Sequence, residues 1–501
     1  MTAGGGLTGA GGIASIRARA PCAAREGETT GMRRILMAAA LLAAGSTNAF
    51  GAEAHGFPGA QLSILWVLPF VGMLLSIALF PLFAAHFWEH HFGKIAAFWA
   101  AALIVPGVVA YGPGIVIGEL LHTLHFEYLP FIILLFALFV VAGGIRLVGN
   151  LVGTPATNTG MLAFGTLIAS LFGTTGASML LIRPMIRANQ NRRRNLHVFI
   201  FFIFLICNIG GSLTPLGDPP LFLGFLMGVD FLWTLTHMLA PMLLCAAILL
   251  GLFYVIDARA WAREAPEVTA HSDLPRSIRI EGVHNVIYLA GIVGAVLISG
   301  IWRPGIDVPL GPGIARPLEG VCRDLALLAI AFMSWKSTNP RIRIESAFTW
   351  APIQEVAFLF AGIFITMIPA LAILRAGREG ALAPLLALVS DANGQPVNAM
   401  YFWLTGALSS FLDNAPTYVV FFNLAGGDPK ALMGPLAGTL LAISAGAVFM
   451  GANSYIGNAP NFMVKAICED RGIRMPSFFG YMAWSCAILL PVFALVTWVF
   501  F

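Results

Sequence analysis

Polar side chains gather at four places in an otherwise apolar chain, and each place also carries glycine or proline. Two of these places hold a carboxylate, Asp218 and Asp413. Carboxylate, hydroxyl and amide oxygens are the ligands that hard cations such as Na⁺ prefer. The candidate ligands at the four places are Thr174, Thr175 and Ser178; Asn208, Ser212, Thr214 and Asp218; Asp413, Asn414 and Thr417; and Asn453, Ser454, Asn458 and Asn461.

Asp218 and Asp413 are the carboxylates at which Na⁺ and H⁺ would compete. Protonation would release a bound cation and cation binding would release the proton, which is antiport in its simplest form. A carboxylate at membrane depth is costly and typically marks a path for an ion or a proton. We therefore predict Na⁺ ligands at both aspartates, with Glu355 as a third candidate proton carrier, and no cofactor besides the transported Na⁺ and H⁺.

Simpler interpretations of these residues stay open. Asp218 and Asp413 could cap the N-termini of helices, since aspartate is favoured at that position. Thr174 and Thr175 could bond to local backbone. Glu355 lies near the start of an apolar span, where it could interact with the helix dipole instead of carrying a proton.

The composition indicates that the elements holding these residues lie in a membrane. The 501 residues are 58% hydrophobic and only 10% charged, whereas soluble chains carry about 25% charged residues. Apolar runs of about 20 residues recur, each long enough to cross a bilayer. The fold class is thus an all-α polytopic membrane protein, which excludes a soluble enzyme, a nucleic-acid binder and a disulfide scaffold.

Hydropathy predicts ten transmembrane crossings and two re-entrant hairpins. Starting the first crossing outside places most loop Lys and Arg inside, as the positive-inside rule requires. The protein is therefore expected in the bacterial inner membrane, with the C-terminus and the processed N-terminus periplasmic. The crossings are 60–83, 95–112, 129–149, 196–227, 231–256, 284–302, 321–337, 354–374, 434–468 and 478–500, and the hairpins are 158–186 and 398–424.

The chain divides into five predicted segments. Residues 1–31 read as a disordered extension upstream of the true start, and 32–52 resemble a signal peptide with a basic end and a short apolar region. A first transporter repeat over 60–256 and a second over 284–501 are joined by a cytoplasmic linker, 257–283.

An internal match supports the two repeats. The stretch from Leu216 to Phe222 aligns with Ile456 to Phe462 at an offset of 240, and Ser170–Ser178 aligns with Ser409–Thr417 at an offset of 239. Five predicted crossings separate the copies, so the second copy is inverted. Inverted repeats with broken helices are typical of secondary transporters, whose substrate lies near the midplane where the breaks meet.

Other conspicuous residues receive plainer interpretations. His86, His90 and His91 are placed in an inner loop as part of an interfacial belt, although His86 and His90 have metal-like spacing. The run Arg192–Arg194 is a topology determinant, and not a nucleic-acid patch. The bilayer is the expected partner, together with a monovalent cation and a proton; a small organic anion and a homodimer stay open.

Two motifs resemble the ion transporter superfamily. The segments Asn208–Pro220 and Ser409–Pro416, together with Trp350–Phe364, are similar to NhaD-type sodium/proton antiporters and their arsenite-permease and citrate-transporter (CitMHS-like) relatives. The resemblance implies paired cation sites at two hairpin tips and two broken helices. The positions that carry over are Asp218, Thr214, Asp413 and Asn414.

The resemblance does not select one substrate. The dicarboxylate branch has Ser-Asn-Thr at its hairpin tips, whereas this chain has Gly-Thr-Thr at 173–175 and Asp-Asn-Ala at 413–415, which favours antiport. A cation-coupled citrate or organic-anion carrier is the first alternative, although the predicted core offers no arginine for bidentate binding. An oxyanion permease follows, and a membrane enzyme lacks a nucleophile–base pair.

Overall fold

The computed structural model describes residues 56–149, 151–264, 278–311, 314–346 and 348–501. The predicted extension 1–31, the signal-like segment 32–52 and residues 265–277 of the predicted linker 257–283 lie outside the described residues. The first five residues of that predicted linker, 257–261, belong to the end of a long helix.

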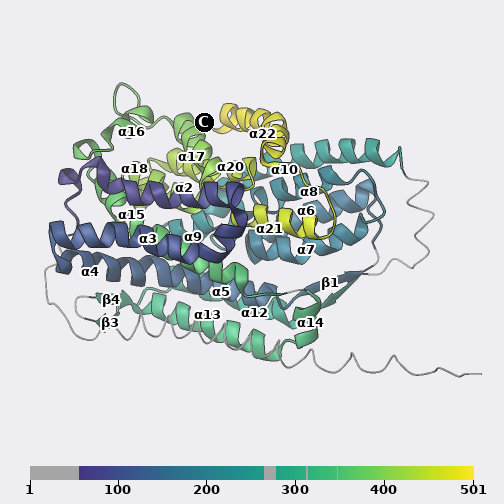
Figure 1. The fold of residues 1–501 in the computed structure, drawn as a ribbon, viewed down its shortest axis with the longest axis horizontal. Coiled ribbons are helices and arrows are strands. Elements are labelled where there is room, and N and C mark those ends of the chain that lie inside the picture. The colour runs from purple at the N-terminus through teal and green to yellow at the C-terminus, as the bar shows by residue number, and fades with distance from the viewer. Residues whose placement is uncertain (1–55, 150, 265–277, 312–313, 347) are drawn as a thin grey trace, which may run out of the picture.

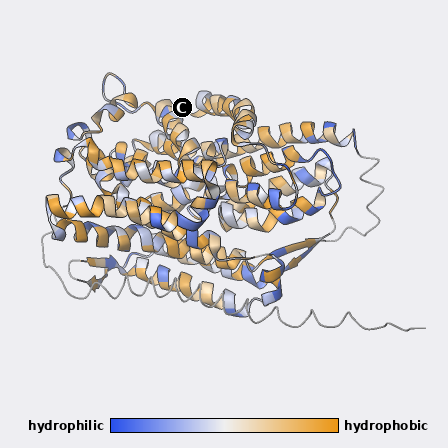
Figure 2. Ribbon diagram, in the orientation of Figure 1, coloured by the Kyte–Doolittle hydropathy of each residue, from blue (hydrophilic) through white to orange (hydrophobic). Residues whose placement is uncertain are grey.

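The described residues form an all-α polytopic membrane protein. Hydrophobic residues dominate the long helices (Figure 2). The helices long and apolar enough to cross a membrane are Ile64–Phe83, His86–Tyr111, Pro113–Ala142, Leu196–Leu213, Phe231–Trp261, His284–Ile301, Ala351–Arg375 and Phe478–Phe500. The other two predicted crossings, 321–337 and 434–468, correspond to a helix with four charged residues and to a broken helix.

The N-terminal part is more helical than the sequence predicted. After two short turns, η1 (Gly59–Gln61) and η2 (Ile64–Val67), it contains α2 (Leu68–Phe83), α3 (Ala85–Tyr111), α4 (Pro113–His122), η3 (Thr123–Tyr128) and α5 (Leu129–Ala142). The predicted inner loop after residue 83 is wrong, because Ala84 alone separates α2 from α3 and the three histidines lie on α3. The predicted loop after residue 112 is likewise α4 and η3, continuous with α5.

The first repeat contains a helix pair and a broken helix. The pair is α6 (Pro155–Phe172) and α7 (Thr174–Ala188), which pack on each other and part at Gly173. The broken helix runs through α8 (Leu196–Leu205), η4 (Ile209–Leu213) and α9 (Pro219–Leu226), and α10 (Phe231–Trp261) follows. Apart from His197, helix α8 is apolar on every face, and it is almost wholly buried, as such a helix must be.

The second repeat has the same sequence of elements. Its helix pair is α17 (Asn398–Phe411) and α18 (Asn414–Leu424), and its broken helix runs through α20 (Ala437–Met450), η6 (Gly451–Asn453) and α21 (Ala459–Asp470). The breaks fall where the sequence predicted them. The remaining elements are α12 (His284–Ile301), α13 (Leu318–Ser337), α14 (Pro340–Glu345), α15 (Ala351–Arg375), η5 (Gly377–Glu379), α16 (Ala383–Leu388), α19 (Pro429–Met433) and α22 (Phe478–Phe500).

Two short antiparallel ribbons lie at the ends of helices. Strand β1 (Arg146–Gly149) pairs with β2 (Ile278–Glu281), and Arg146 faces Glu281 in that register with an ion pair of 3.1 Å. Strand β3 (Asp307–Gly311) pairs with β4 (Ile314–Pro317) between α12 and α13. Helices α12 and α13 pack on each other and on α5, along the lower side of the molecule in Figure 1.

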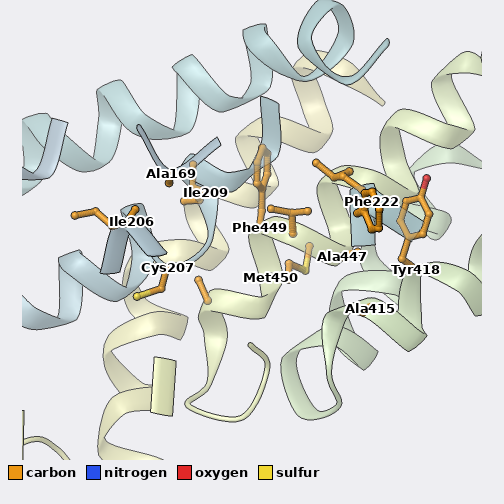
Figure 3. Packing of buried hydrophobic residues seen from close by; sticks show 14 of the residues in the cluster. Ala169, Ile206, Cys207, Ile209, Phe222, Ala415, Tyr418, Ala447, Phe449 and Met450 are labelled. Atoms are coloured by element: carbon orange, nitrogen blue, oxygen red, sulfur yellow. The ribbon is translucent and has the colours of Figure 1, made fainter. Parts of the chain in front are cut away.

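Apolar side chains close the space around the breaks. Phe222 of α9 lies beside Tyr418 of α18, and Phe449 and Met450 lie at the end of α20 (Figure 3). Tyr418 and Phe222 are each 1% exposed. The polar groups at the breaks are therefore surrounded by hydrocarbon, where each of them needs a partner.

Candidate functional site

The two broken helices have the same backbone geometry at matching positions. Thr214 and Ser454 are both extended, with φ near −140°. Asp218 and Asn458 are also extended and each precedes the helix that resumes the chain. Both pairs are 240 residues apart. The internal repeat is thus visible in local structure as well as in sequence.

Asp218 lies where the four breaks meet. Its side chain is 1% exposed. Thr174 Oγ1 donates to Asp218 Oδ1 at 2.9 Å, and Asn458 Nδ2 donates to the same oxygen at 3.0 Å. Asn414 Nδ2 donates to Asp218 Oδ2 at 2.5 Å. Each donor comes from a different break, so the carboxylate of one break binds the other three.

A pair of asparagines links the broken helices beside Asp218. Asn208 Nδ2 donates to Asn461 Oδ1 at 2.8 Å. Asn458 Nδ2 approaches Asn208 Oδ1 at 3.3 Å. Asn461 Nδ2 in turn donates to the carbonyl oxygens of Gly451 and Ser454, both at 2.9 Å. These amides satisfy backbone groups that the breaks in the helices leave without partners.

Each helix pair is held to its own broken helix by an equivalent hydroxyl. Thr214 Oγ1 donates to the carbonyl oxygen of Ser170, and Ser454 Oγ donates to that of Ser410. These matches correct the predicted alignment of Ser170 with Ser409, because the structural offset is 240 at the helix pairs too. Thr174 is therefore equivalent to Asn414, and both donate to Asp218.

Two glycines let the backbone of each break fold back on itself. A Cβ added to Gly217 would lie 2.1 Å from the carbonyl oxygen of Gly211, and one added to Gly457 would lie 2.6 Å from that of Gly451. Real Cβ atoms do not approach an oxygen so closely. Glycine is therefore required on steric grounds as the first residue of both the Gly-Asp-Pro and the Gly-Asn-Ala sequence.

The two aspartates differ in what their side chains do. Asp413 Oδ1 accepts from the backbone N–H of Ala415 at 3.0 Å, so Asp413 caps α18. Asp218 makes no such bond to α9, and its oxygens are used by the other breaks instead. Asp413 directly precedes Asn414, whose amide donates to Asp218.

Other predicted ligands serve the local backbone. Ser212 Oγ donates to the carbonyl oxygen of Ile209, and Thr417 Oγ1 donates to that of Asp413. Asn453 Nδ2 donates to Ser410 Oγ at 2.9 Å. Thr175 is half-buried in the first turn of α7. These residues support the shape of the site, while Thr174, Asn414 and Asn458 contact its carboxylate.

Two amide oxygens in the site have no hydrogen-bond donor among the residues that the structure describes. They are Oδ1 of Asn414 and Oδ1 of Asn453, and both are buried. A buried carbonyl oxygen without a partner costs about 1–3 kcal/mol. Such an oxygen is also a suitable ligand for a hard cation.

Glu355 takes no part in this network. It lies on α15, half-buried, and its Oε1 accepts from the indole N–H of Trp88 on α3 at 2.9 Å. No hydrogen bond joins Glu355 to the described residues of the four breaks. Its role as a proton carrier stays a prediction.

The structure contains a buried ionic cluster that was not predicted from the sequence. Arg192 is paired with Asp257 at 2.6 Å and with Glu264 at 2.8 Å. His197 Nε2 lies 2.8 Å from the same Asp257, and Asn158 donates to it at 3.0 Å. The cluster joins α6, α8 and α10. The sequence signals were the three adjacent arginines, interpreted above as a topology determinant, and Asp257, which falls at the start of the predicted linker.

Four helix N-termini begin at the site. Helices α7, α9, α18 and α21 start at or directly after Thr174, Asp218, Asn414 and Asn458. Helix N-termini carry partial positive charge and favour an anion. All the side chains that the structure shows bonded to Asp218 are neutral. Helix dipoles and amides therefore stabilise this carboxylate, without an opposing full charge.

Apolar spanning helices interrupted by a buried polar centre define a membrane transport protein. The chain belongs to the family described as "Putative citrate transport", whose model matches residues 59–501, and which is part of the ion transporter superfamily. The match confirms the predicted superfamily and covers both repeats. No curated protein matches the chain.

Proposed function

We propose that this protein is a secondary transporter that exchanges Na⁺ or Li⁺ for H⁺ at Asp218. The observation that carries the proposal is the bonding of one buried carboxylate to neutral donors from all three other breaks. The described side chains that bond to Asp218 thus leave its negative charge without a positively charged partner. This charge is available to whichever small cation enters.

Competition for Asp218 supplies the coupling. Hydrogen bonds and helix dipoles offset only part of the cost of a buried carboxylate that has no positively charged partner, so the site favours the states in which Asp218 holds either a proton or a metal cation. The unpartnered Oδ1 atoms of Asn414 and Asn453 would complete the ligand set for Na⁺. Binding of one cation at Asp218 then displaces the other.

Asp413 is the second carboxylate of the proposed mechanism. One of its oxygens is used in capping α18, which leaves the other for a cation. Its charge would repel that of Asp218 when both are ionised, and this repulsion favours uptake of a proton or Na⁺. The two aspartates would thus act as a coupled pair, one from each repeat.

Citrate transport is the second candidate function, and two observations favour it. The family match carries that description, and four helix N-termini begin at the site, an arrangement that favours bound carboxylates. In this version Asp218 would bind the coupling cation, and the N-termini of α7 and α18 would bind the anion.

Proton flux in reconstituted vesicles separates the two candidates. A pH-sensitive dye would report proton movement after addition of Na⁺, Li⁺, K⁺ or citrate. The antiporter gives a signal on Na⁺ or Li⁺ alone that is lost in Asp218→Asn and kept in Asp428→Asn, a control at an exposed N-cap. Silence with cations and a response to citrate would establish the anion carrier. Wild-type exchange by Asp218→Asn would refute both.

A further inference from the structure

A cavity of about 530 Å³ lies away from the four breaks, at the ends of α10 and α12. Its walls come from the last turn of α9, the start of α10, the end of α12, and the junction of β4 with α13. Its volume falls within the range of about 300–1,000 Å³ that is typical of ligand pockets. The cavity therefore has room for more than ordered water.

The lining carries charges of both signs that have no ion-pair partner in the described part of the chain. Arg303, Asp230 and Glu319 line the cavity, and none of them forms an ion pair with a described residue. Glu319 Oε2 is buried and accepts no hydrogen bond. A buried acceptor without a donor is costly, so this oxygen points to a ligand that donates hydrogen bonds and carries positive charge.

Two more arginines provide a basic wall. Arg316 and Arg323 share one carboxylate, Asp324, at 2.7 and 2.8 Å. Three nitrogens of the two guanidinium groups make these bonds, and the group as a whole retains one positive charge. Planar guanidinium groups are well suited to phosphate oxygens. The cavity thus offers an anion site and a cation site together.

The surroundings of the cavity are apolar and exposed. Leu232 lines it and begins an exposed stripe along one face of α10 that continues through Leu235, Leu239 and Leu243. On the opposite side, Ile301 of α12 is also exposed, and Trp302 follows it. Exposed leucines on a spanning helix face hydrocarbon, and tryptophan is enriched at the membrane–water interface. The cavity therefore opens at headgroup depth.

We propose that this cavity binds the headgroup of an ethanolamine phospholipid. The phosphodiester would contact Arg303 and the pair Arg316–Arg323, and the primary ammonium would donate to Glu319 and Asp230. The acyl chains would lie on the leucine stripe of α10. A choline headgroup has no N–H to give Glu319, and a glycerol headgroup has no positive charge, so both fit less well.

Occupation of this cavity would act on the helix that follows Asp218. Helix α9 has eight residues, with Asp218 at its N-terminus, and Phe225 and Leu226 near its other end line the cavity. A lipid headgroup would hold the far end of α9 in place. This last step rests on the proposed function of Asp218, whereas lipid binding itself does not.

Thermal unfolding of purified, delipidated protein in detergent tests the binding. The probes are phosphatidylethanolamine, phosphatidylcholine and phosphatidylglycerol at matched concentrations, together with citrate. We expect phosphatidylethanolamine to raise the unfolding midpoint at the lowest concentration. Arg303→Ala should require an at least about tenfold higher concentration of it, because a hydrogen bond to a charged group is lost. Native mass spectrometry of the same samples would count retained lipids.

Glu319→Gln should abolish the preference for ethanolamine over glycerol headgroups, while Glu379→Gln, a control at an exposed glutamate away from the cavity, should keep it. Both variants are compared with and without lipid, so a change in basal stability does not affect the result. An equal response to all three lipids, or wild-type selectivity in Glu319→Gln, would overturn the proposal. Stabilisation by citrate alone would show a substrate vestibule instead. None of these outcomes depends on whether the protein exchanges Na⁺ for H⁺.

Discussion

Exchanging Asp218 with Asn458 tests whether this carboxylate and this amide are in contact at the centre of the site. The two side chains share a hydrogen bond of 3.0 Å and occupy equivalent extended positions in the two repeats. The double variant Asp218→Asn with Asn458→Asp keeps one carboxylate and one amide in contact. It moves the charge from the first repeat to the second.

The single variants should behave very differently from each other. Asp218→Asn keeps the shape, and its new N–H group can donate to the unpartnered Oδ1 of Asn414 after a turn of that amide. We expect a loss in the free energy of unfolding of about 1.5 kcal/mol or less, one net hydrogen bond. Asn458→Asp places two carboxylate oxygens in contact, with a repulsion on the order of 5 kcal/mol at an effective dielectric constant of about 20.

The repulsion has a definite dependence on pH. At low pH the two carboxylates of Asn458→Asp share a proton and the protein stays folded, and stability is lost as the pH rises and that proton leaves. The double variant has one carboxylate, so its stability should return to within about 1.5 kcal/mol of wild type. Its ion exchange should recover only in part, because Thr174 and Asn414 then contact an amide in place of the carboxylate.

Unfolding followed by tryptophan fluorescence at pH 6 and pH 9, with proton flux in vesicles, would measure both effects. Wild-type stability of Asn458→Asp at pH 9 would mean that positions 218 and 458 are not in contact. A double variant as unstable as Asn458→Asp would mean that the loss has a cause other than charge. Either result would refute the proposed meeting of the breaks.

Three further outcomes are expected. Gly217→Ala should yield little folded protein because its Cβ would lie 2.1 Å from a backbone oxygen, whereas Gly251→Ala on α10, with nothing within 4 Å, should express normally. Asp413→Asn should keep its cap and unfold within about 0.5 kcal/mol of wild type, yet lose Na⁺-driven proton flux; retained flux would exclude Asp413 from coupling. Arg192→Ala should cost about 3–5 kcal/mol in a denaturation assay by leaving Asp257 buried without its cation, and wild-type stability would argue against the buried pair.

The predictable part of this protein follows from composition and from the breakers in its helices. Apolar runs predicted the all-α class, and the glycines and prolines near 211–219 and 451–459 predicted the broken helices. A break in a buried helix needs permissive residues and polar partners, and both are visible in sequence. The four places named from sequence do meet, and Asp218 is at their centre.

The unpredicted part depends on which side chains face each other. Sequence could not distinguish Asp218, which binds three other breaks, from Asp413, which caps its own helix, because both precede a helix start. The predicted alignment of the two helix pairs was off by one residue, because Ser409 and Ser410 are both serines. Only the structure shows that Ser410, which donates to the carbonyl oxygen of Met450, is equivalent to Ser170, which donates to that of Gly210. Ser409 donates to the carbonyl oxygen of Ala447 instead. The histidines of α3 were misplaced because a one-residue connection leaves no polar loop to detect.

The equivalent hydroxyls of Thr214 and Ser454 limit how the site can move. Each ties a helix pair to its own broken helix, and parting them would leave buried groups unpaired at about 1–3 kcal/mol each. Asp218 and the asparagine pair tie the two halves together in turn. We therefore expect the four breaks to travel as one body against the surrounding helices, carrying the ion with them. A cross-link inside that body should leave exchange intact, and one from it to α13 should stop it.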